Sequence, residues 1–290
     1  GDDAGVYALG GRLVVQTIDI ITPIVNDPYT FGAISAANSL SDVYAMGGTP
    51  LTAMAMLGFS PCGDIAIVRE IMRGAVDTLI KAHTVLLGGH SYKDDELKFG
   101  LSVTGTTEII VRSQGARSGD VVLLTKPIGT GVLSTALKGR KIIEADMKDA
   151  VGSMLTLNDK ASKAAVNAGA TSMTDVTGFG LLGHALNMVK DSGLDMELKV
   201  KDIPVFQRVR EFISQGIAPE GAYDNLKFLS GKVVRDNLSE EELLLLADPQ
   251  TSGGLLITIG GPSLTAFQKE FSAFSIIGKI IDGKGKIRLA

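Results

Sequence analysis

Five aspartates in the sequence stand among apolar or small residues, where a carboxylate needs a specific partner. They are Asp2, Asp3, Asp19, Asp42 and Asp175. An ionised carboxylate is costly in such surroundings unless it is paired or binds a metal ion. Magnesium prefers oxygen ligands and usually shares one or two carboxylates with the phosphates of a substrate. The aspartates therefore favour a metal-bridged triphosphate site, although any one of them alone is also typical of a helix cap or a turn.

Four glycine-containing segments support the same chemistry, because backbone N–H groups in glycine turns can approach an anion closely. They are Gly47-Gly48, Gly88-Gly89-His90-Ser91, Gly129-Thr130-Gly131 and Gly178-Phe179-Gly180. The last segment also opens a predicted helix, whose positive end favours phosphate. Each segment alone is also typical of an ordinary tight turn.

The sequence has three histidines, and their positions differ in what they predict. His90 lies in a predicted glycine turn and is the best candidate to contact a phosphate or a base. His83 ends a predicted amphipathic helix and is expected to be a surface or capping residue. His184 lies on a predicted helix and is expected to pack or to be hydrogen-bonded in the core.

Several other catalytic signatures are missing or misplaced. The sequence contains no Walker A motif, no His-Glu-x-x-His and no Gly-x-Ser-x-Gly elbow. The run Gly178-x-Gly180-x-x-Gly183 matches the dinucleotide fingerprint, and Glu197 lies near the expected distance. That fingerprint should follow an apolar strand, whereas here Asp175 precedes it and would repel a pyrophosphate without a cation between them. We therefore do not favour nicotinamide binding.

The composition excludes further classes. The formal net charge of the 290 residues is −4 and no basic block occurs, so we expect no nucleic-acid partner. No apolar run approaches the roughly 18 residues of a membrane helix, so no membrane partner is expected. The single cysteine, Cys62, cannot form an internal disulfide and fits a reducing cytosol, so we expect a cytoplasmic protein. Cys62 is expected to be a loop thiol, since a nucleophile would need a base that the neighbouring sequence lacks.

Hydrophobic periodicity indicates strands and helices mixed in both halves, an α/β or α+β class. The predicted strands span residues 6–9, 13–20, 51–57, 85–87, 99–110, 121–125, 255–259 and 276–281, and the predicted helices span 31–46, 65–82, 148–167, 180–190, 239–247 and 263–271. A polar, glycine-containing stretch over 113–120 predicts a boundary between two domains, 1–113 and 114–290.

Several of these stretches resemble a known family. Asp2-Asp3-Ala4 with Asp19, and the run from Asn38 to Pro50, look like the amino-terminal domain of the aminoimidazole ribonucleotide synthetase superfamily. Three further stretches resemble the selenophosphate synthetase family within it: Gly88–Ser91, Thr174–His184 and Asp248–Gly254. The resemblance covers essentially the whole chain, and its eleven-residue central stretch is highly specific.

The resemblance implies a set of site residues. Asp3, Asp42 and Asp175 would bind Mg²⁺. ATP would be contacted by Asp2, Asp19, Asp42, Gly89, His90 and Ser91. The family reaction converts ATP, selenide and water to selenophosphate, AMP and phosphate.

The resemblance also implies an architecture. Residues 1–113 would form an ATP- and metal-binding dimerisation domain, and residues 114–290 an α+β domain. The amino-terminal strands of two subunits would build a shared barrel, with the nucleotide sites at the subunit junction of the homodimer. Gly89 to Ser91 would then reach the ATP of the partner subunit.

The sequence departs from the family at its start. The family carries a glycine-rich segment with a catalytic cysteine or selenocysteine and a lysine, and neither can be placed in a chain that opens at Gly1. We expect both residues upstream of Gly1, since Cys62 does not align with them. Two alternatives stay open: a non-catalytic nucleotide-binding homologue, and a related kinase acting on thiamine monophosphate.

Overall fold

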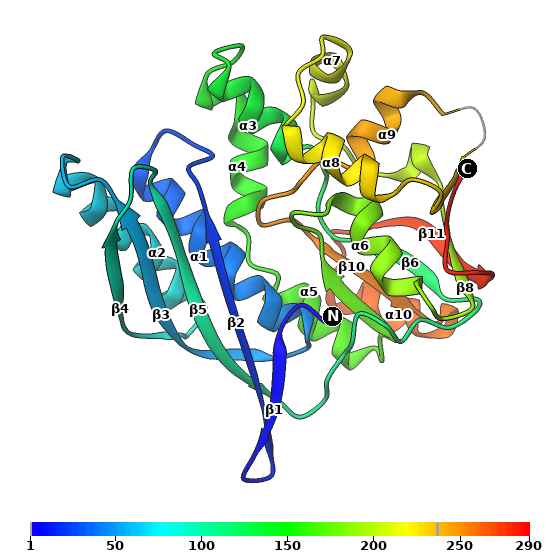
Figure 1. Ribbon diagram of the computed structural model, residues 1–290. Helices are drawn as coiled ribbons and strands as arrows, with labels where there is room; N and C mark the ends of the chain where they lie inside the picture. The colour runs from blue at the N-terminus through cyan, green and yellow to red at the C-terminus, as the bar shows by residue number, and fades with distance from the viewer. Residues whose placement is uncertain (1, 236–237) are drawn as a thin grey trace.

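The computed structural model describes residues 2–235 and 238–290, so residue 1 of the expected first domain lies outside the described part. The chain builds two sheets, each with helices packed on it (Figure 1). Strands and helices are mixed in both halves, as expected, and both sheets mix parallel and antiparallel pairs. None of the helices in the described part combines the length and the apolar character needed to cross a bilayer.

The first unit contains five strands and two long helices. Its elements are β1 (Gly5–Leu9), β2 (Arg12–Ile21), α1 (Pro28–Ala45), β3 (Thr49–Phe59), α2 (Ile65–Lys81), β4 (Val85–Lys93) and β5 (Lys98–Thr107). The strand order is β1-β2-β5-β3-β4, with β3 and β4 parallel and the other pairs antiparallel. Strand β4 is therefore an edge strand, and β5 and β3 separate it from β2.

Local sequence explains why α1 and α2 begin where they do and how closely they pack. Asp27 caps α1 by accepting the Thr30 N–H at 2.8 Å, and Asp64 caps α2 in the same way. A Cβ on Gly32 would lie 1.9 Å from the Ile71 carbonyl oxygen. The missing side chain therefore allows the two helices to come into backbone contact.

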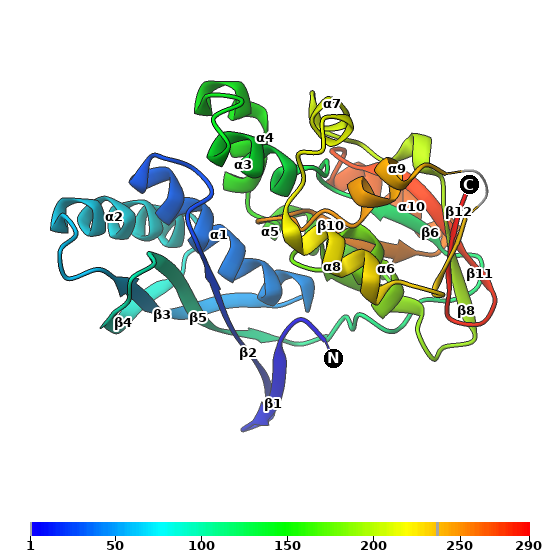
Figure 2. The same cartoon turned by 45° about the horizontal axis from the view of Figure 1, so that its top comes forward.

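The two faces of the first sheet differ. Figure 2 shows α1 and α2 on one face, while no helix or strand of the described chain covers the other. Strand register places Ile18, Met54 and Tyr7 on this open face. Their exposed fractions are 56%, 53% and 69%. Large apolar side chains exposed together on one sheet face indicate an interaction surface.

The second unit has a seven-stranded sheet in the order β7-β10-β6-β11-β8-β12-β9. Its strands are β6 (Val121–Leu124), β7 (Ser172–Asp175), β8 (Leu194–Leu198), β9 (Val233–Arg235), β10 (Leu255–Ile259), β11 (Ser275–Asp282) and β12 (Ile287–Leu289). Its helices are α3 (Thr130–Lys138), α4 (Lys148–Leu155), α5 (Asp159–Asn167), α6 (Gly180–Val189), α7 (Val209–Ser214), α8 (Glu220–Phe228), α9 (Glu240–Leu246) and α10 (Gly261–Glu270), with short 3₁₀ turns η1 (Glu144–Met147) and η2 (Val200–Asp202).

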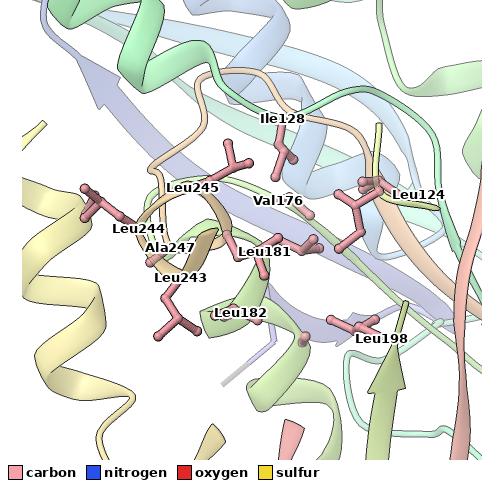
Figure 3. Close-up of a cluster of buried hydrophobic side chains, with 14 of the residues drawn as sticks. Leu124, Ile128, Val176, Leu181, Leu182, Leu198, Leu243, Leu244, Leu245 and Ala247 are labelled. Atoms are coloured by element: carbon pink, nitrogen blue, oxygen red, sulfur yellow. The ribbon is translucent and has the colours of Figure 1, made fainter. Parts of the chain in front are cut away.

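The largest core cluster lies in this second unit. Leucines from α6 and α9 meet beside strand residues of the sheet (Figure 3). Leu181 and Leu245 are almost completely buried there, as are Leu124 and Leu198. Ser239 accepts the Glu242 N–H at 3.1 Å and so caps α9, as the sequence predicts. Helix α1 of the first unit packs against α4, α5 and β7 of the second, so the two units share a continuous boundary.

Two of the expected element boundaries are wrong. The predicted helix over 148–167 is divided into α4 and α5. The backbone leaves the helical conformation at Thr156, whose ψ is 122°, and the Asn158 side chain between the two helices bonds Ser41 Oγ and the Gly253 carbonyl. The predicted strand over 85–87 continues to Lys93, and Gly88–Ser91 is strand rather than turn. Its backbone pairs in parallel with β3, and a Cβ on Gly89 would lie 2.2 Å from the Ala55 carbonyl oxygen.

The dinucleotide fingerprint lies in a different context from the one expected. A strand does precede Gly178, namely β7, and α6 begins at Gly180. However, β7 is an edge strand whose partner β10 runs antiparallel, and β8, which follows α6, lies on the far side of β11. A Cβ on Gly180 would lie 2.6 Å from the Ala247 backbone, so close chain packing explains this glycine.

Candidate active site

A cavity of about 280 Å³ lies where β2 and α1 of the first unit meet β7 and α6 of the second. It collects polar side chains from segments far apart in the sequence. Its lining includes Asp2, Asp3, Thr17, Asp19, Asp42, Ser113, Thr174, Thr177, Phe179 and His184. Four of the five aspartates singled out in the sequence thus line one cavity, and the fifth, Asp175, is buried beside it.

Asp19 and Asp42 come from the first unit and face one another across β2 and α1. Asn38 and Asp42 are four residues apart on α1 and therefore share a helix face. Thr17 and Asp19 alternate on β2 and therefore share a strand face. The Thr17 hydroxyl donates to Asp42 Oδ2 at 2.5 Å, and Asn38 Nδ2 donates to Asp19 Oδ2. Each carboxylate is thus held by one neighbour and keeps its other oxygen free of these two bonds.

Asp3 is held by a hydrogen-bond chain that begins in the second unit. The Thr177 N–H donates to His184 Nε2 at 3.1 Å, so the proton of a neutral His184 ring lies on Nδ1. That Nδ1 lies 3.3 Å from Thr174 Oγ1, which donates to Asp3 Oδ1 at 2.7 Å. Burial lowers the pKa of His184 to about 4, so the ring stays neutral near pH 7. The expectation that His184 is a hydrogen-bonded core residue is confirmed.

Asp2 is tied to the segment that joins the two units. Its Oδ2 forms an ion pair with Arg112 at 2.8 Å. Its Oδ1 accepts from the Ser113 N–H at 3.1 Å and from the Ser113 hydroxyl at 2.9 Å. These contacts anchor the start of the described chain at the mouth of the cavity.

Asp175 differs from its neighbours because almost no contact in the protein offsets the cost of burying its charge. It ends β7, and its side chain is 1% exposed. Among the residues that the structure describes, neither of its carboxylate oxygens has a hydrogen-bond partner, and Asp3 Oδ2 also has none. The Ser41 hydroxyl lies near Asp175 and favours its charged form, but the geometry between them is not that of a hydrogen bond. Buried oxygens without partners in the protein are rare in native structures, and a bound cation is one way to satisfy them.

Burial, and then the crowding of the carboxylates, raises their pKa values. Burial and then the nearby charge of Asp175 raise the pKa of Asp42 to about 9. The same two causes raise the pKa of Asp3 well above its usual range. Burial raises the pKa of Asp175 to about 6. Each shift reports that a negative charge is unfavourable in this place without a cation.

The residue set fits a magnesium ion in its chemistry, although the protein alone does not complete the coordination sphere. In the described ranges, no three His, Cys, Asp or Glu side chains already surround a single point at metal-binding distance. Mg²⁺ usually keeps several water or phosphate oxygens and takes only one or two carboxylates from the protein. The free oxygens of Asp3 and Asp175 are of the kind that such an ion accepts.

Other predicted phosphate contacts lie away from this cavity. Gly89, His90 and Ser91 are exposed on β4, the far edge of the first sheet, and do not line the cavity. Pairing of His90 with Met56 places His90 on the open face of that sheet. His83 is exposed at the end of α2, as expected. Cys62 is an exposed free thiol in the loop before α2.

The turn Gly129-Thr130-Gly131 opens α3, but its N–H groups already have partners. Gln250 Oε1 accepts from Gly129 N–H at 2.9 Å and from Thr130 N–H at 3.1 Å. Asp248 Oδ2 accepts from Gly131 N–H at 3.1 Å. The expectation that this turn offers N–H groups to an anion is therefore wrong, because side chains of the protein occupy the position.

Sequence reasoning missed the residues that hold the carboxylates. Thr17 and Thr174 each precede a predicted site aspartate by one or two positions, which was the available signal. Asn38 and Ser252 lie within stretches quoted for the family resemblance, but their pairing at 2.7 Å joins parts of the chain 214 residues apart. Lys126 lies two residues after the four apolar residues of β6 and is 7% exposed, which is unusual for a lysine.

Comparison with family models covers almost the whole chain. The AIR synthase related protein N-terminal domain matches residues 1–107, and the corresponding C-terminal domain matches residues 117–289. "Selenide, water dikinase 2" of Peptoclostridium acidaminophilum is 42% identical over 98% of this chain and 84% of its own length. "Selenide, water dikinase" of Geobacter metallireducens is 46% identical over 89% of this chain and 76% of its own length.

Solved structures share the fold at low identity. Thiamine monophosphate kinase from Aquifex aeolicus superposes with a TM-score of 0.74 at 17% identity, covering 99% of this chain and 90% of that one. The hydrogenase maturation protein HypE in complex with ATP superposes with a TM-score of 0.72 at 15% identity, covering 99% and 84%. From the matched domains and the relatives that align along nearly the whole chain, this chain belongs to the selenide, water dikinase family of AIR synthase related proteins.

Proposed function

We propose that this chain synthesises selenophosphate from ATP, selenide and water and releases AMP and phosphate. Relatives named selenide, water dikinase support this activity at 42% and 46% identity. The observation in the molecule that carries the proposal is the set of unpartnered oxygens on Asp3 and Asp175 beside a polar cavity. Phosphoryl transfer depends mainly on positioning and on neutralising charge, and this site concentrates the ligands for that task.

Asp3, Asp42 and Asp175 would hold Mg²⁺. The ion would neutralise the triphosphate and polarise the phosphoryl group that selenide attacks. The chain contributes the geometry, because Thr174 and Thr17 each fix one oxygen of Asp3 and Asp42 and leave the second oxygen available. The Se–P bond forms as the bond from the γ-phosphorus to the bridging oxygen breaks, and water then hydrolyses ADP to AMP and phosphate.

The nucleotide would lie along the rest of the cavity. Asp2 and Asp19 line it with Asp42 and would contact ATP. In the proposed homodimer, Gly89, His90 and Ser91 would reach the ATP of the partner subunit. The open face of the first sheet supports this arrangement, since His90 shares that face with the exposed apolar residues Ile18 and Met54.

We further propose that residues 1–113 act as the ATP-binding and dimerisation domain and residues 114–290 as the second domain, in a cytoplasmic enzyme. The homodimer can be tested by mixing two inactive variants, His90→Ala and Asp175→Asn. If one site uses His90 from one subunit and Asp175 from the other, random pairing restores roughly a quarter of the wild-type rate. Absence of any restored activity in a mixed dimer would contradict the shared site.

The reaction is tested on protein expressed from its whole open reading frame. Incubation with ATP, Mg²⁺ and selenide should yield AMP, phosphate and selenophosphate in equal amounts by ³¹P NMR, and omission of selenide should suppress AMP formation. Formation of ADP with thiamine monophosphate would instead identify a kinase for that substrate. Nucleotide binding without turnover would identify a non-catalytic homologue, and either result would overturn the proposal.

A further inference from the structure

Lys126 is a buried lysine that the proposed mechanism does not use. It lies two residues after the end of β6 and is 7% exposed. Among the residues that the structure describes, no carboxylate lies within 4.0 Å of its ammonium group. Instead Nζ donates to the Thr156 carbonyl at 2.7 Å and to the Ser252 carbonyl at 2.9 Å. Burying an ammonium is costly, so we expect a lysine at this position to have a role that an apolar side chain could not fill.

The two carbonyls belong to segments that a cation can hold in place. Thr156 is the C-cap of α4, where the carbonyl groups of a helix carry partial negative charge. Ser252 has a φ of +47°, a left-handed conformation that non-glycine residues adopt rarely. Its hydroxyl donates to the Met154 carbonyl at 2.7 Å. Lys126 therefore joins the end of α4 to a turn held in an uncommon backbone conformation.

The turn that contains Ser252, Gly253 and Gly254 (the Ser252 turn) also contacts the first unit. The Ser252 N–H donates to Asn38 Oδ1 at 2.7 Å. Because a backbone N–H can only donate, this bond fixes which end of the Asn38 amide is the oxygen. The Nδ2 end must then face Asp19, and it donates to Asp19 Oδ2. One unbroken series of contacts thus runs from Lys126 through Ser252 and Asn38 to a carboxylate of the cavity.

The turn leaves little room to adopt another position. A Cβ on Gly253 would lie 2.0 Å from the Val176 carbonyl oxygen, and one on Gly254 would lie 2.4 Å from the Lys126 backbone nitrogen. Asn158 also bonds the Gly253 carbonyl and Ser41 Oγ, both at 2.9 Å. The turn is therefore packed against the segment after Asp175 and against α1, which carries Asp42.

We propose that Lys126 is a positioning residue of the nucleotide site, which holds the Ser252 turn so that its N–H orients Asn38 and, through Asn38, the Asp19 carboxylate. The inference rests on the proposed function only in assigning Asp19 to the nucleotide. A positioning residue that acts through a ligand typically changes affinity by about 10- to 100-fold.

The test measures the affinity for a non-hydrolysable Mg²⁺–ATP analogue by calorimetry, which needs no selenide. Lys126→Met should weaken binding about tenfold, and Lys126→Arg, which keeps the donors, should retain most of the affinity. Lys138→Met is the matched control, since Lys138 is an exposed lysine at the end of α3, and it should leave the affinity unchanged. Unaltered affinity in a folded Lys126→Met protein would overturn the proposal.

A double-mutant cycle separates positioning of Asp19 from general destabilisation. In an Asp19→Ala background, Lys126→Met should cause no further loss, since the carboxylate on which it acts is gone. The same tenfold loss in that background would overturn the proposal. If Lys126→Met does not fold, Asn38→Ala tests the same series of contacts with Lys126 in place, and unchanged affinity there would also overturn it.

The double-mutant cycle and the selenide-dependent reaction assay can give negative results independently of one another. A wild-type protein that makes no AMP with selenide would refute the proposed function, while the affinity cycle would still decide the role of Lys126. Conversely, normal selenide-dependent turnover, combined with additive effects of Lys126→Met and Asp19→Ala on affinity, would refute only the role of Lys126.

Discussion

Two aspartates of the second unit, Asp175 and Asp195, are equally buried but have opposite surroundings. Their side chains are 1% and 0% exposed. Asp195 Oδ1 accepts from the N–H groups of Lys284 and Lys286 at 2.7 and 2.9 Å, and its Oδ2 accepts from Arg288 at 2.7 Å. Burial alone would raise the pKa of Asp195, but these donors outweigh it and lower the pKa. Asp175 has no such donors, and its pKa rises to about 6.

The comparison separates a structural carboxylate from one that is ready to bind a ligand. Asp195 closes the turn between β11 and β12, and both of its oxygens already have donors from the same chain. Asp248 is intermediate, because Oδ2 accepts from Gly131 and Gln250 while Oδ1 has no partner within the described part of the chain. Its pKa rises to about 7 because it is buried. Burial of an aspartate therefore says little about its role until the partners of its oxygens are known.

The largest expected effect comes from removing the charge of Asp175. We expect Asp175→Asn to lower Mg²⁺-dependent ATP turnover by about 10³-fold, since a ligand for the charge on the triphosphate is lost. The free energy of unfolding without Mg²⁺ should not fall, because the change also removes repulsion with Asp3 and Asp42. Turnover assays and denaturant unfolding measure the two effects. Asp42→Asn should behave alike, and near-normal turnover in both variants would refute the metal assignment.

Asp195→Asn should show the reverse pattern. Loss of its charge weakens three hydrogen bonds at once, and we expect the free energy of unfolding to fall by about 2 kcal/mol. The affinity for a Mg²⁺–ATP analogue should stay at the wild-type value, because Asp195 does not line the cavity. Urea unfolding and calorimetry provide the two readouts. A protein of unchanged stability would show that the partners of Asp195 contribute nothing.

A smaller effect should appear in the pH dependence of stability. The folded pKa values of Asp175 and Asp42, about 6 and about 9, lie above the ordinary value of 3.8. For such groups folding favours the protonated form, so the free energy of unfolding falls as pH rises from about 4 to 9. Each proton contributes up to about 1.4 kcal/mol per pH unit. Mg²⁺ should remove this fall, because the ion binds the charged form.

Thermal unfolding between pH 5 and pH 9, with and without Mg²⁺, measures this effect. Asp175→Asn should flatten the slope in the absence of the ion. Asp195 acts with the opposite sign: its contribution is present above its unfolded pKa and is lost only as pH falls through its lowered folded pKa. Equal slopes with and without Mg²⁺ would contradict the difference drawn between the two carboxylates.

The sequence could predict which carboxylates gather at the cavity but not how they are held. Alternating apolar residues located β2, and the cap at Ser239 located the start of α9. In contrast, the glycines of Gly88–Ser91 suggest a turn, while pairing with β3 makes them strand. Local propensity cannot include a partner strand, so tertiary contacts decided the outcome.

The supporting contacts were hidden for a similar reason. Asn38, Lys126 and Ser252 come from three distant segments, and only the packed fold brings them together. Asp195 carries no signal that distinguishes it from Asp175, since its donors follow it by about 90 residues. A chain can therefore show the type of chemistry in its residues, while the partners of each polar atom emerge only from the structure.

The most direct test of the central claim is a crystal structure of the protein with Mg²⁺ and a non-hydrolysable ATP analogue. We predict one or more Mg²⁺ ions at about 2.1 Å from oxygens of Asp3, Asp42 and Asp175, with the triphosphate completing their coordination and Asp195 unchanged. A nucleotide bound elsewhere, with these three carboxylates free of any ion, would contradict the account.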